Sequence, residues 1–267
     1  MQCAAEVDAE GRELAYPSNF DRYGSDLAPE RSGRWPLRME FNLSNSCNLQ
    51  CIQCNGLLSS SIRLHREGRP PLPTVYDDRF FSDLEEFIPH LVDAQFAGGE
   101  PFMAAETYRV WDLIRRLNPG LRCVTVTNAT QWNSRVQAVI EELAMGFVFS
   151  LDGVTKETYE AVRIGADFDS VMANVERYST MARRNGQPLE VNYCHMVQNY
   201  RELPDVLRWA EERHMRANVS VVRDPESCSL AAADDGLLRG GPAVLRSPVR
   251  PGSRGIWCST LLPGSKK

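Results

Sequence analysis

The chain has 267 residues, and its 30 Lys and Arg side chains against 35 Asp and Glu side chains give a net charge of −5. A hydrophobic content of 43% with 24% charged residues is that of a globular protein and excludes a disordered chain. The acidic balance argues against a nucleic-acid binder, and no apolar run is long enough to span a membrane. The polar N-terminus contains no apolar signal region, so we expect a cytoplasmic location.

Residues 1–37 are polar with little periodicity, and we interpret them as an N-terminal extension. From residue 38 to 224, short runs rich in Val, Phe, Thr and Tyr alternate with amphipathic segments, which predicts alternating strands and helices. The expected strands are Met39–Leu43, Asp93–Ala97, Arg122–Thr127, Phe147–Leu151, Leu189–Met196 and Asn218–Val222. The expected helices are Asp77–Ile88, Thr107–Leu117, Ser134–Met145, Lys156–Val162, Phe168–Asn185 and Leu203–Glu212.

This alternation indicates an α/β fold with a parallel sheet, because parallel strands need long crossover connections. Six units are too few for a closed eight-stranded barrel, so a partial (β/α)6 barrel or a doubly wound sheet remains. The segment 55–74, with Gly and several Pro, predicts a long irregular connection, which is usually functional or mobile. Residues 225–267 are rich in Gly, Pro, Ser and Arg and predict an irregular, poorly packed tail.

Three of the eight cysteines, Cys47, Cys51 and Cys54, have the spacing C-x3-C-x2-C directly after the first expected strand. In a cytosolic chain such a cluster indicates metal binding or catalysis rather than disulfides. An iron–sulfur cube normally takes four Cys ligands, so three from one loop would leave one iron open to another ligand. A structural zinc site with a distant fourth Cys or His would fit the same spacing equally well.

Further motifs follow the later strands in order. The sequence FAGGEP occupies residues 96–101, VTVTN occupies 124–128 and FSLDG occupies 149–153, followed by the pattern R-x-G-x-x-F at 163–168. With the cysteine triplet, these motifs resemble the radical S-adenosylmethionine (SAM) superfamily over residues 38–222. The segment 197–204, VQNYRELP, resembles the exit of the fifth strand in peptide-modifying members.

The resemblance implies a partial (β/α)6 TIM-like barrel of the radical SAM type. It implies that Cys47, Cys51 and Cys54 ligate a [4Fe–4S] cluster, and that SAM binds the open iron through its amino and carboxylate groups. An electron from the reduced cluster would cleave SAM to methionine and a 5′-deoxyadenosyl radical, which abstracts a hydrogen atom from the substrate. A reductant such as flavodoxin or ferredoxin is the expected source of that electron.

Eight residues of these motifs are candidates for binding SAM, because ligands of parallel sheets bind where the strands end. They are Gly98, Gly99, Glu100, Pro101, Asn128, Ser150, Asp152 and Arg163. The two glycines allow a ligand to approach the backbone closely, Pro101 stiffens the turn, and Glu100 can accept a hydrogen bond from an ammonium group. The other polar side chains suit the ribose or the methionyl end, with Arg163 matching a carboxylate. Gln53 stands where many members carry an aromatic residue.

Within the superfamily, the chain looks closest to SPASM and twitch members, which carry an auxiliary iron–sulfur domain. Such a domain needs clustered cysteines, and the tail holds only Cys228 and Cys258, so we expect it to be at most a remnant. The favoured hypothesis is hydrogen abstraction from a peptide or small natural-product substrate. The alternatives are a non-catalytic or truncated iron–sulfur or zinc protein and a twitch-type alcohol or sugar dehydrogenase.

Overall fold

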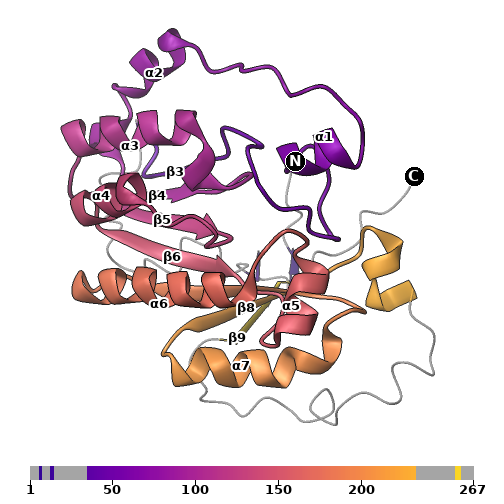
Figure 1. The fold of residues 1–267 in the computed structure, drawn as a ribbon. Helices are drawn as coiled ribbons and strands as arrows, with labels where there is room; N and C mark the ends of the chain where they lie inside the picture. The colour runs from indigo at the N-terminus through magenta and orange to yellow at the C-terminus, as the bar shows by residue number, and fades with distance from the viewer. Residues whose placement is uncertain (1–5, 8–12, 15–34, 233–255, 260–267) are drawn as a thin grey trace.

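The computed structural model describes residues 6–7, 13–14, 35–232 and 256–259. Seven strands form one sheet in the order in which they occur along the chain, and every neighbouring pair is parallel (Figure 1). They are β3 (Arg38–Phe41), β4 (Asp93–Phe96), β5 (Arg122–Thr127), β6 (Met145–Ser150), β7 (Leu189–His195), β8 (Arg216–Val221) and β9 (Ile256–Ser259). A doubly wound sheet reverses its strand order at a switch point, so this sequential order identifies the partial-barrel alternative.

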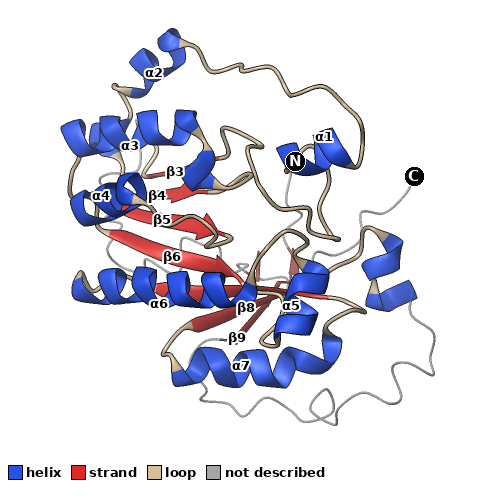
Figure 2. Cartoon of the chain, in the orientation of Figure 1, coloured by secondary structure: helices blue, strands red, loops and turns tan. Residues whose placement is uncertain are grey.

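Helices cover the outer face of this curved sheet (Figure 2). Those along the sheet are α3 (Ala105–Leu117), α4 (Ser134–Glu142), α6 (Phe168–Arg184) and α7 (Leu203–Glu212). Helix α1 (Ser60–His65) lies beside the loop that follows β3, α2 (Asp78–Leu84) packs against α3, and the end of α5 (Lys156–Val162) contacts the loop after β3. Single 3-10 turns lie at η3 (Ile88–His90), η4 (Pro101–Met103), η5 (Tyr200–Glu202), η6 (Glu226–Cys228) and η7 (Leu230–Ala232). A separate antiparallel pair joins β1 (Glu6–Val7) and β2 (Glu13–Leu14).

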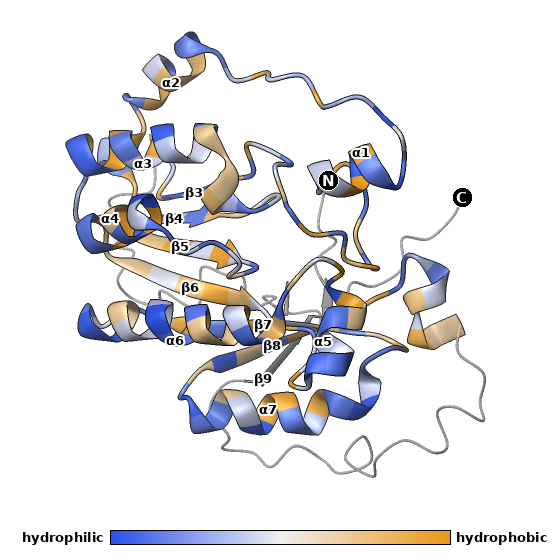
Figure 3. Ribbon diagram, viewed as in Figure 1, coloured by the Kyte–Doolittle hydropathy of each residue, from blue (hydrophilic) through white to orange (hydrophobic). Residues whose placement is uncertain are grey.

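The core lies between the sheet and the long helices, which are hydrophobic on one side and hydrophilic on the other (Figure 3). Large aromatic side chains fill its centre: the ring of Tyr178 on α6 lies 4.9 Å from that of Phe147, and the ring of Trp111 on α3 lies 5.3 Å from that of Phe96. All four side chains are fully buried, so they hold the helices against the sheet through large apolar contacts. The loops at the carboxyl ends of the strands are thereby held on a rigid frame.

Two expected helices end earlier than predicted. The helix expected over Asp77–Ile88 ends at Leu84, since the chain turns at Glu85 and Pro89 lies in the separate turn η3. The helix expected over Ser134–Met145 ends at Glu142. Leu143 is already extended and buried, and Met145 begins β6, because a short connection must return these apolar residues to the sheet.

The segment 55–74 differs from the expected irregular connection, because it contains helix α1. The hydroxyl oxygen of Ser59 accepts the backbone N–H of Ile62, which caps the helix, and the same hydroxyl donates to the carbonyl oxygen of Leu49 at 2.7 Å. This single serine therefore begins α1 and fixes it to the cysteine-containing loop.

The expected poorly packed tail also differs from the structure in its described part. Cys228 is fully buried and packs against Val162 and Met196, and β9 pairs in parallel with β8 at the edge of the sheet. The segments 233–255 and 260–267 of that tail lie outside the described residues, as does most of the expected N-terminal extension. Across the described residues, no helix combines the length and the apolar character needed to cross a bilayer.

Candidate active site

The three cysteines lie in the loop that follows β3, and this loop is fastened on two sides. The backbone N–H of Cys47 donates to Oγ of Ser60 on α1 at 3.0 Å. On the other side, the N–H groups of Gln50 and Ile52 donate to the carbonyl oxygens of Ile164 and Val162, at 2.8 and 3.0 Å. The loop therefore spans from α1 to the end of α5, and its backbone is ordered by the protein itself.

The thiols of this loop are held in their neutral form. Burial raises the pKa of Cys51 to about 11, and burial likewise raises the pKa values of Cys47 and Cys54 above their ordinary value. A metal that binds thiolates must displace these protons, so binding at this loop would release protons and become tighter as the pH rises.

Gly98 and Gly99 lie directly against this loop rather than beside open space. The N–H of Gly99 donates to the carbonyl oxygen of Ser44 at 3.0 Å. A Cβ atom on Gly98 would lie 2.8 Å from the same oxygen, and one on Gly99 would lie 2.4 Å from the carbonyl oxygen of Ser46. Gly98 also has φ of +112°, which side chains rarely adopt. The absence of side chains at these two positions therefore lets the backbone pack closely against the cysteine loop, while the expected approach of a ligand to this backbone stays a prediction.

Glu100 is buried and its carboxylate is already occupied. Oε1 accepts the hydroxyl of Thr127 at 2.8 Å, and Oε2 accepts the backbone N–H of Asn128 at 2.7 Å. Burial raises the pKa of Glu100 to about 7, although both of these hydrogen bonds oppose that shift. These two hydrogen bonds join the carboxyl ends of β4 and β5, and the expected contact of Glu100 with an ammonium group stays a prediction. Pro101, the next residue, is buried in η4 and begins that turn.

Asn128 follows β5, and its side chain contacts the cysteine loop. Its Nδ2 donates to Oδ1 of Asn48 at 3.2 Å and to Sγ of Cys47 at 3.7 Å. Its Oδ1 accepts the backbone N–H of Thr130 at 2.9 Å, which fixes the orientation of the amide. The side chain therefore directs a hydrogen-bond donor at a cysteine sulfur.

Asp152 and Arg163 form a buried ion pair, with Nη2 of Arg163 2.7 Å from Oδ2 of Asp152. Oδ2 also accepts Nε2 of Gln53 at 2.7 Å, and Oδ1 accepts the backbone N–H of Cys194 at 2.7 Å. Burial opposes the charge of the guanidinium, but Asp152 and the acidic groups of Cys51, Tyr159 and Cys194 together outweigh it and raise the pKa of Arg163. The carboxylate that pairs with Arg163 is that of Asp152, and the expected contact of Arg163 with a carboxylate of a ligand stays a prediction.

The structure brings most of the predicted residues to one end of the sheet. Ser150 ends β6 with a half-buried side chain and pairs in register with Asn192 of β7. The sequence analysis did not assign Glu202 to the site. Its carboxylate accepts the backbone N–H groups of Val154 and Thr155, which begin the segment leading to α5. The only sequence signal for it was its place in the segment 197–204.

Two cavities open near these loops. One, of about 280 Å³, is lined by Cys47, Ser60 and several residues of the α1 segment, including Arg63 and Arg69. The other, of about 410 Å³, is lined by Thr158 and the residues 197–202 that follow β7.

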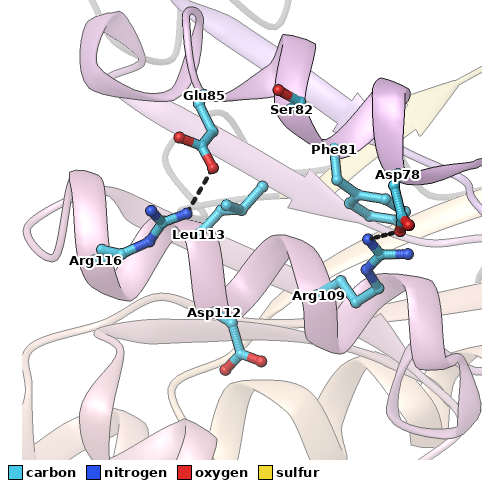
Figure 4. A pocket seen from close by; sticks show the side chains of 8 residues that line it. All are labelled: Asp78, Phe81, Ser82, Glu85, Arg109, Asp112, Leu113 and Arg116. Atoms are coloured by element: carbon cyan, nitrogen blue, oxygen red, sulfur yellow. Dashed lines mark hydrogen bonds and ion pairs between the residues drawn. The ribbon is translucent and has the colours of Figure 1, made fainter.

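A third cavity, of about 340 Å³, lies between α2 and α3 in the outer helical layer. Figure 4 shows that ion pairs cross it, from Arg109 to Asp78 and from Arg116 to Glu85, each at 2.7 Å. These side chains satisfy one another, and the cavity is built by helices rather than by the loops that follow the strands. It is therefore a poor candidate for an active site.

The donor set tests which metal the cysteine loop suits. A zinc ion needs its ligands gathered around one point, at about 2.3 Å for each sulfur. Within the described part of the chain, no three His, Cys, Asp or Glu side chains are gathered closely enough for one metal ion. An iron–sulfur cube takes each thiolate on a different iron, so its ligands stand further apart. The three thiols of the loop are sulfur donors of the kind that an iron–sulfur cluster takes.

The sequence of the chain matches one protein-family model. The family model "Radical SAM superfamily" matches residues 41–210, which include the cysteine loop and most of the sheet. The chain belongs to the radical SAM superfamily. Radical SAM enzymes use a [4Fe–4S] cluster and SAM, so these are the two cofactors that the family implies for this chain.

Curated relatives of this radical SAM chain carry different activities. It is 22% identical over 191 residues to the probable GTP 3′,8-cyclase of Methanocaldococcus jannaschii, covering 68% of this chain and 58% of the relative. It is 26% identical over 211 residues to the AdoMet-dependent heme synthase of Methanosarcina barkeri, covering 74% of this chain and 55% of the relative. The chain therefore spans little more than half the length of these relatives.

Solved structures share the fold. SuiB of Streptococcus suis bound to S-adenosylmethionine aligns with a TM-score of 0.58 and 15% identity, over 85% of this chain and 51% of SuiB. The enzyme anSMEcpe with bound AdoMet aligns with a TM-score of 0.52 and 18% identity, over 70% of this chain and 52% of that one. At these identities the likeness establishes the fold, and it confirms the predicted partial barrel.

Proposed function

We propose that Cys47, Cys51 and Cys54 ligate the [4Fe–4S] cluster and that SAM binds beside them, at the carboxyl ends of β4, β5 and β6. The observation that carries this proposal is the convergence of Asn128 and Arg163 on two of the three cysteine sulfurs, at 3.7 and 3.8 Å. When bound, the reduced cluster supplies the electron that cleaves SAM to methionine and a radical able to abstract hydrogen.

The chain's own residues hold this site in shape. Gly98 and Gly99 let β4 pack against the backbone that leads into the cysteine loop, and Glu100 fastens Asn128 beside Cys47. Asp152 holds the Arg163 guanidinium against Cys51. Because these residues act mainly on the loop, we assign them positioning roles in addition to any contact with SAM.

We propose a peptide as the substrate, with a small natural-product precursor as the broader class. Supporting this, a structure of SuiB bound to its precursor peptide SuiA aligns with a TM-score of 0.52 over 86% of this chain. The cavity of about 410 Å³ lies at residues 197–202, within the segment that resembles peptide-modifying members. On β7 and β8, polar side chains lie together: Nδ2 of Asn218 donates to Glu190 at 2.7 Å and to Asn192 at 3.2 Å. Amide and carboxylate groups of this kind suit a substrate with many hydrogen-bonding groups.

We also place the chain among SPASM- or twitch-like members, with a reductant such as flavodoxin or ferredoxin as its electron donor. The cavity beside Cys47, lined by Arg63 and Arg69, offers an acidic donor protein a basic approach to the cluster.

The test is anaerobic reconstitution with iron and sulfide, followed by reduction with dithionite in the presence of SAM and chromatography for 5′-deoxyadenosine. The proposal expects about four irons per chain and 5′-deoxyadenosine formation. Retention of zinc with no bound iron would overturn it in favour of a zinc protein, and a cluster without SAM cleavage would favour a non-catalytic one. Adding GTP or candidate peptides to the same reaction then separates substrate classes by which one stimulates SAM cleavage.

A further inference from the structure

A buried pair of opposite charges lies against one of the proposed cluster ligands. Nη1 of Arg163 donates to Sγ of Cys51 at 3.8 Å, while Nη2 lies 2.7 Å from Oδ2 of Asp152. The side chain of Arg163 is 8% exposed and that of Asp152 is 0% exposed. Charges removed from water in this way act on their neighbours much more strongly than surface charges do.

The surrounding contacts keep this pair in place. Asp152 accepts hydrogen bonds from Gln53 and from the backbone of Cys194, so its carboxylate cannot turn away from Arg163. Nε of Arg163 and Oε1 of Gln53 are buried and have no partner among the described residues. A buried ion pair with incomplete hydrogen bonding contributes little net stability, because its desolvation offsets its attraction. Stability alone therefore does not account for a fixed cation on a cysteine sulfur.

We propose that Arg163 and Asp152 together set the reduction potential of the [4Fe–4S] cluster, with Arg163 as a positioning residue that acts through Cys51. This inference rests on the proposed function, in which Cys51 is a cluster ligand. The potential of an iron–sulfur cluster depends on local charge and on hydrogen bonds to its sulfurs. Reduction adds one electron, and hence one negative charge, to the cluster. The guanidinium favours that change, whereas the Asp152 carboxylate opposes it.

The two side chains therefore have opposite effects, which a merely structural role would not produce. Arg163→Met removes the cation and the donor to sulfur and is expected to lower the potential. Asp152→Asn removes the anion, keeps an oxygen for the N–H of Cys194, and is expected to raise the potential. Arg163→Lys keeps the charge and is expected to lie between Arg163→Met and the unaltered protein.

The chain offers a matched control pair. Arg38 and Asp93 are also a buried ion pair, 3.5 Å apart with 10% and 2% exposed side chains, but they begin β3 and β4. They therefore lie at the amino ends of the strands, away from the cysteine loop. Arg38→Met and Asp93→Asn are expected to leave the potential unchanged.

The experiment titrates the reconstituted full chain with dithionite under anaerobic conditions and follows the reduced cluster by electron paramagnetic resonance, without SAM or substrate. Shifts of opposite sign for Asp152→Asn and Arg163→Met, with none for the controls, support the inference. Shifts of the same sign, or shifts no larger than those of the controls, overturn it. If Arg163→Met fails to fold, an unchanged reduction potential in Asp152→Asn is sufficient to overturn the inference. If the unaltered chain binds no cluster, the proposed function fails, whereas a cluster with an unmoved potential contradicts only this inference.

Discussion

The backbone N–H of Asn128 donates to Oε2 of Glu100 at 2.7 Å and so joins the carboxyl ends of two neighbouring strands. The same carboxylate accepts the hydroxyl of Thr127 through Oε1. Because Asn128 in turn contacts Cys47, one proposed cluster ligand is linked through Asn128 to a buried acid 28 residues away from it in the chain.

The pH dependence of folding is expected to reflect this carboxyl group. Its pKa is about 7 in the folded chain, against 4.5 as the ordinary value. Between these two values the folded state binds more protons than the unfolded state, so stability falls as the pH rises from 4.5 to 7. A shift of this size corresponds to roughly 3 kcal/mol. Glu100→Gln is expected to flatten this dependence in urea unfolding of the cluster-free chain at pH 5 and pH 7.5. An unchanged slope in the variant would show that another group is responsible.

The two glycines of the GGEP motif are expected to be intolerant of even one methyl group. Gly99→Ala places a Cβ atom 2.4 Å from the carbonyl oxygen of Ser46, so the cysteine loop must shift. We expect a loss of roughly 2 kcal/mol or more in the free energy of unfolding, together with loss of cluster on reconstitution. Gly120→Ala is the control, because a Cβ atom there meets nothing within 4 Å. Equal stability and equal iron content in Gly99→Ala and Gly120→Ala would contradict the assigned packing.

The three loop cysteines are expected to be individually essential for the cluster. Replacing Cys47, Cys51 or Cys54 with Ala removes one of three protein ligands, so the absorbance of the reconstituted cluster and the formation of 5′-deoxyadenosine should both disappear. Cys123→Ala is a suitable control, because Cys123 is more deeply buried than any of the three but lies on β5 among core residues. Retained cluster absorbance in any of the three variants would remove that cysteine from the ligand set.

Glu202 is expected to matter for the loop that carries Asp152. Its carboxylate accepts two backbone N–H groups, those of Val154 and Thr155, and the hydroxyl of Thr155, at the start of α5. Glu202→Ala leaves these donors without their partner and is expected to cost about 1–2 kcal/mol in thermal or urea unfolding. Glu211→Ala, an exposed position on α7, should change stability by less than about 0.5 kcal/mol. Similar losses in both variants would show that Glu202 has no special role in holding this loop.

Local sequence patterns predicted the bounds of a helix correctly where all the residues that determine them lie within one segment. The helices expected over Lys156–Val162 and Leu203–Glu212 have the same bounds in the structure, because their caps and apolar spacing lie within a few residues. The bounds of a helix differed from the prediction where the next strand includes residues of the same apolar pattern. Leu143 and Met145 continue the helical pattern of α4, but Leu143 is already extended and Met145 begins β6. Both side chains are part of the hydrophobic core, and this packing outweighs the local helical pattern.

The alternation of strands and helices, the three cysteines in one loop and the polar motifs after successive strands could all be predicted from the amino-acid sequence. Each of these depends on spacing along the chain, which is visible without a structure. Three features required the folded chain: the sequential order of the strands, the approach of Gly99 to the backbone of Ser46, and the pairing of Arg163 with Asp152 beside Cys51. Such contacts join segments as far apart as Cys51 and Arg163, which are 112 residues apart. Because a polar side chain can satisfy its charge with a ligand or with its own protein, its partner is fixed only when the fold brings one within reach.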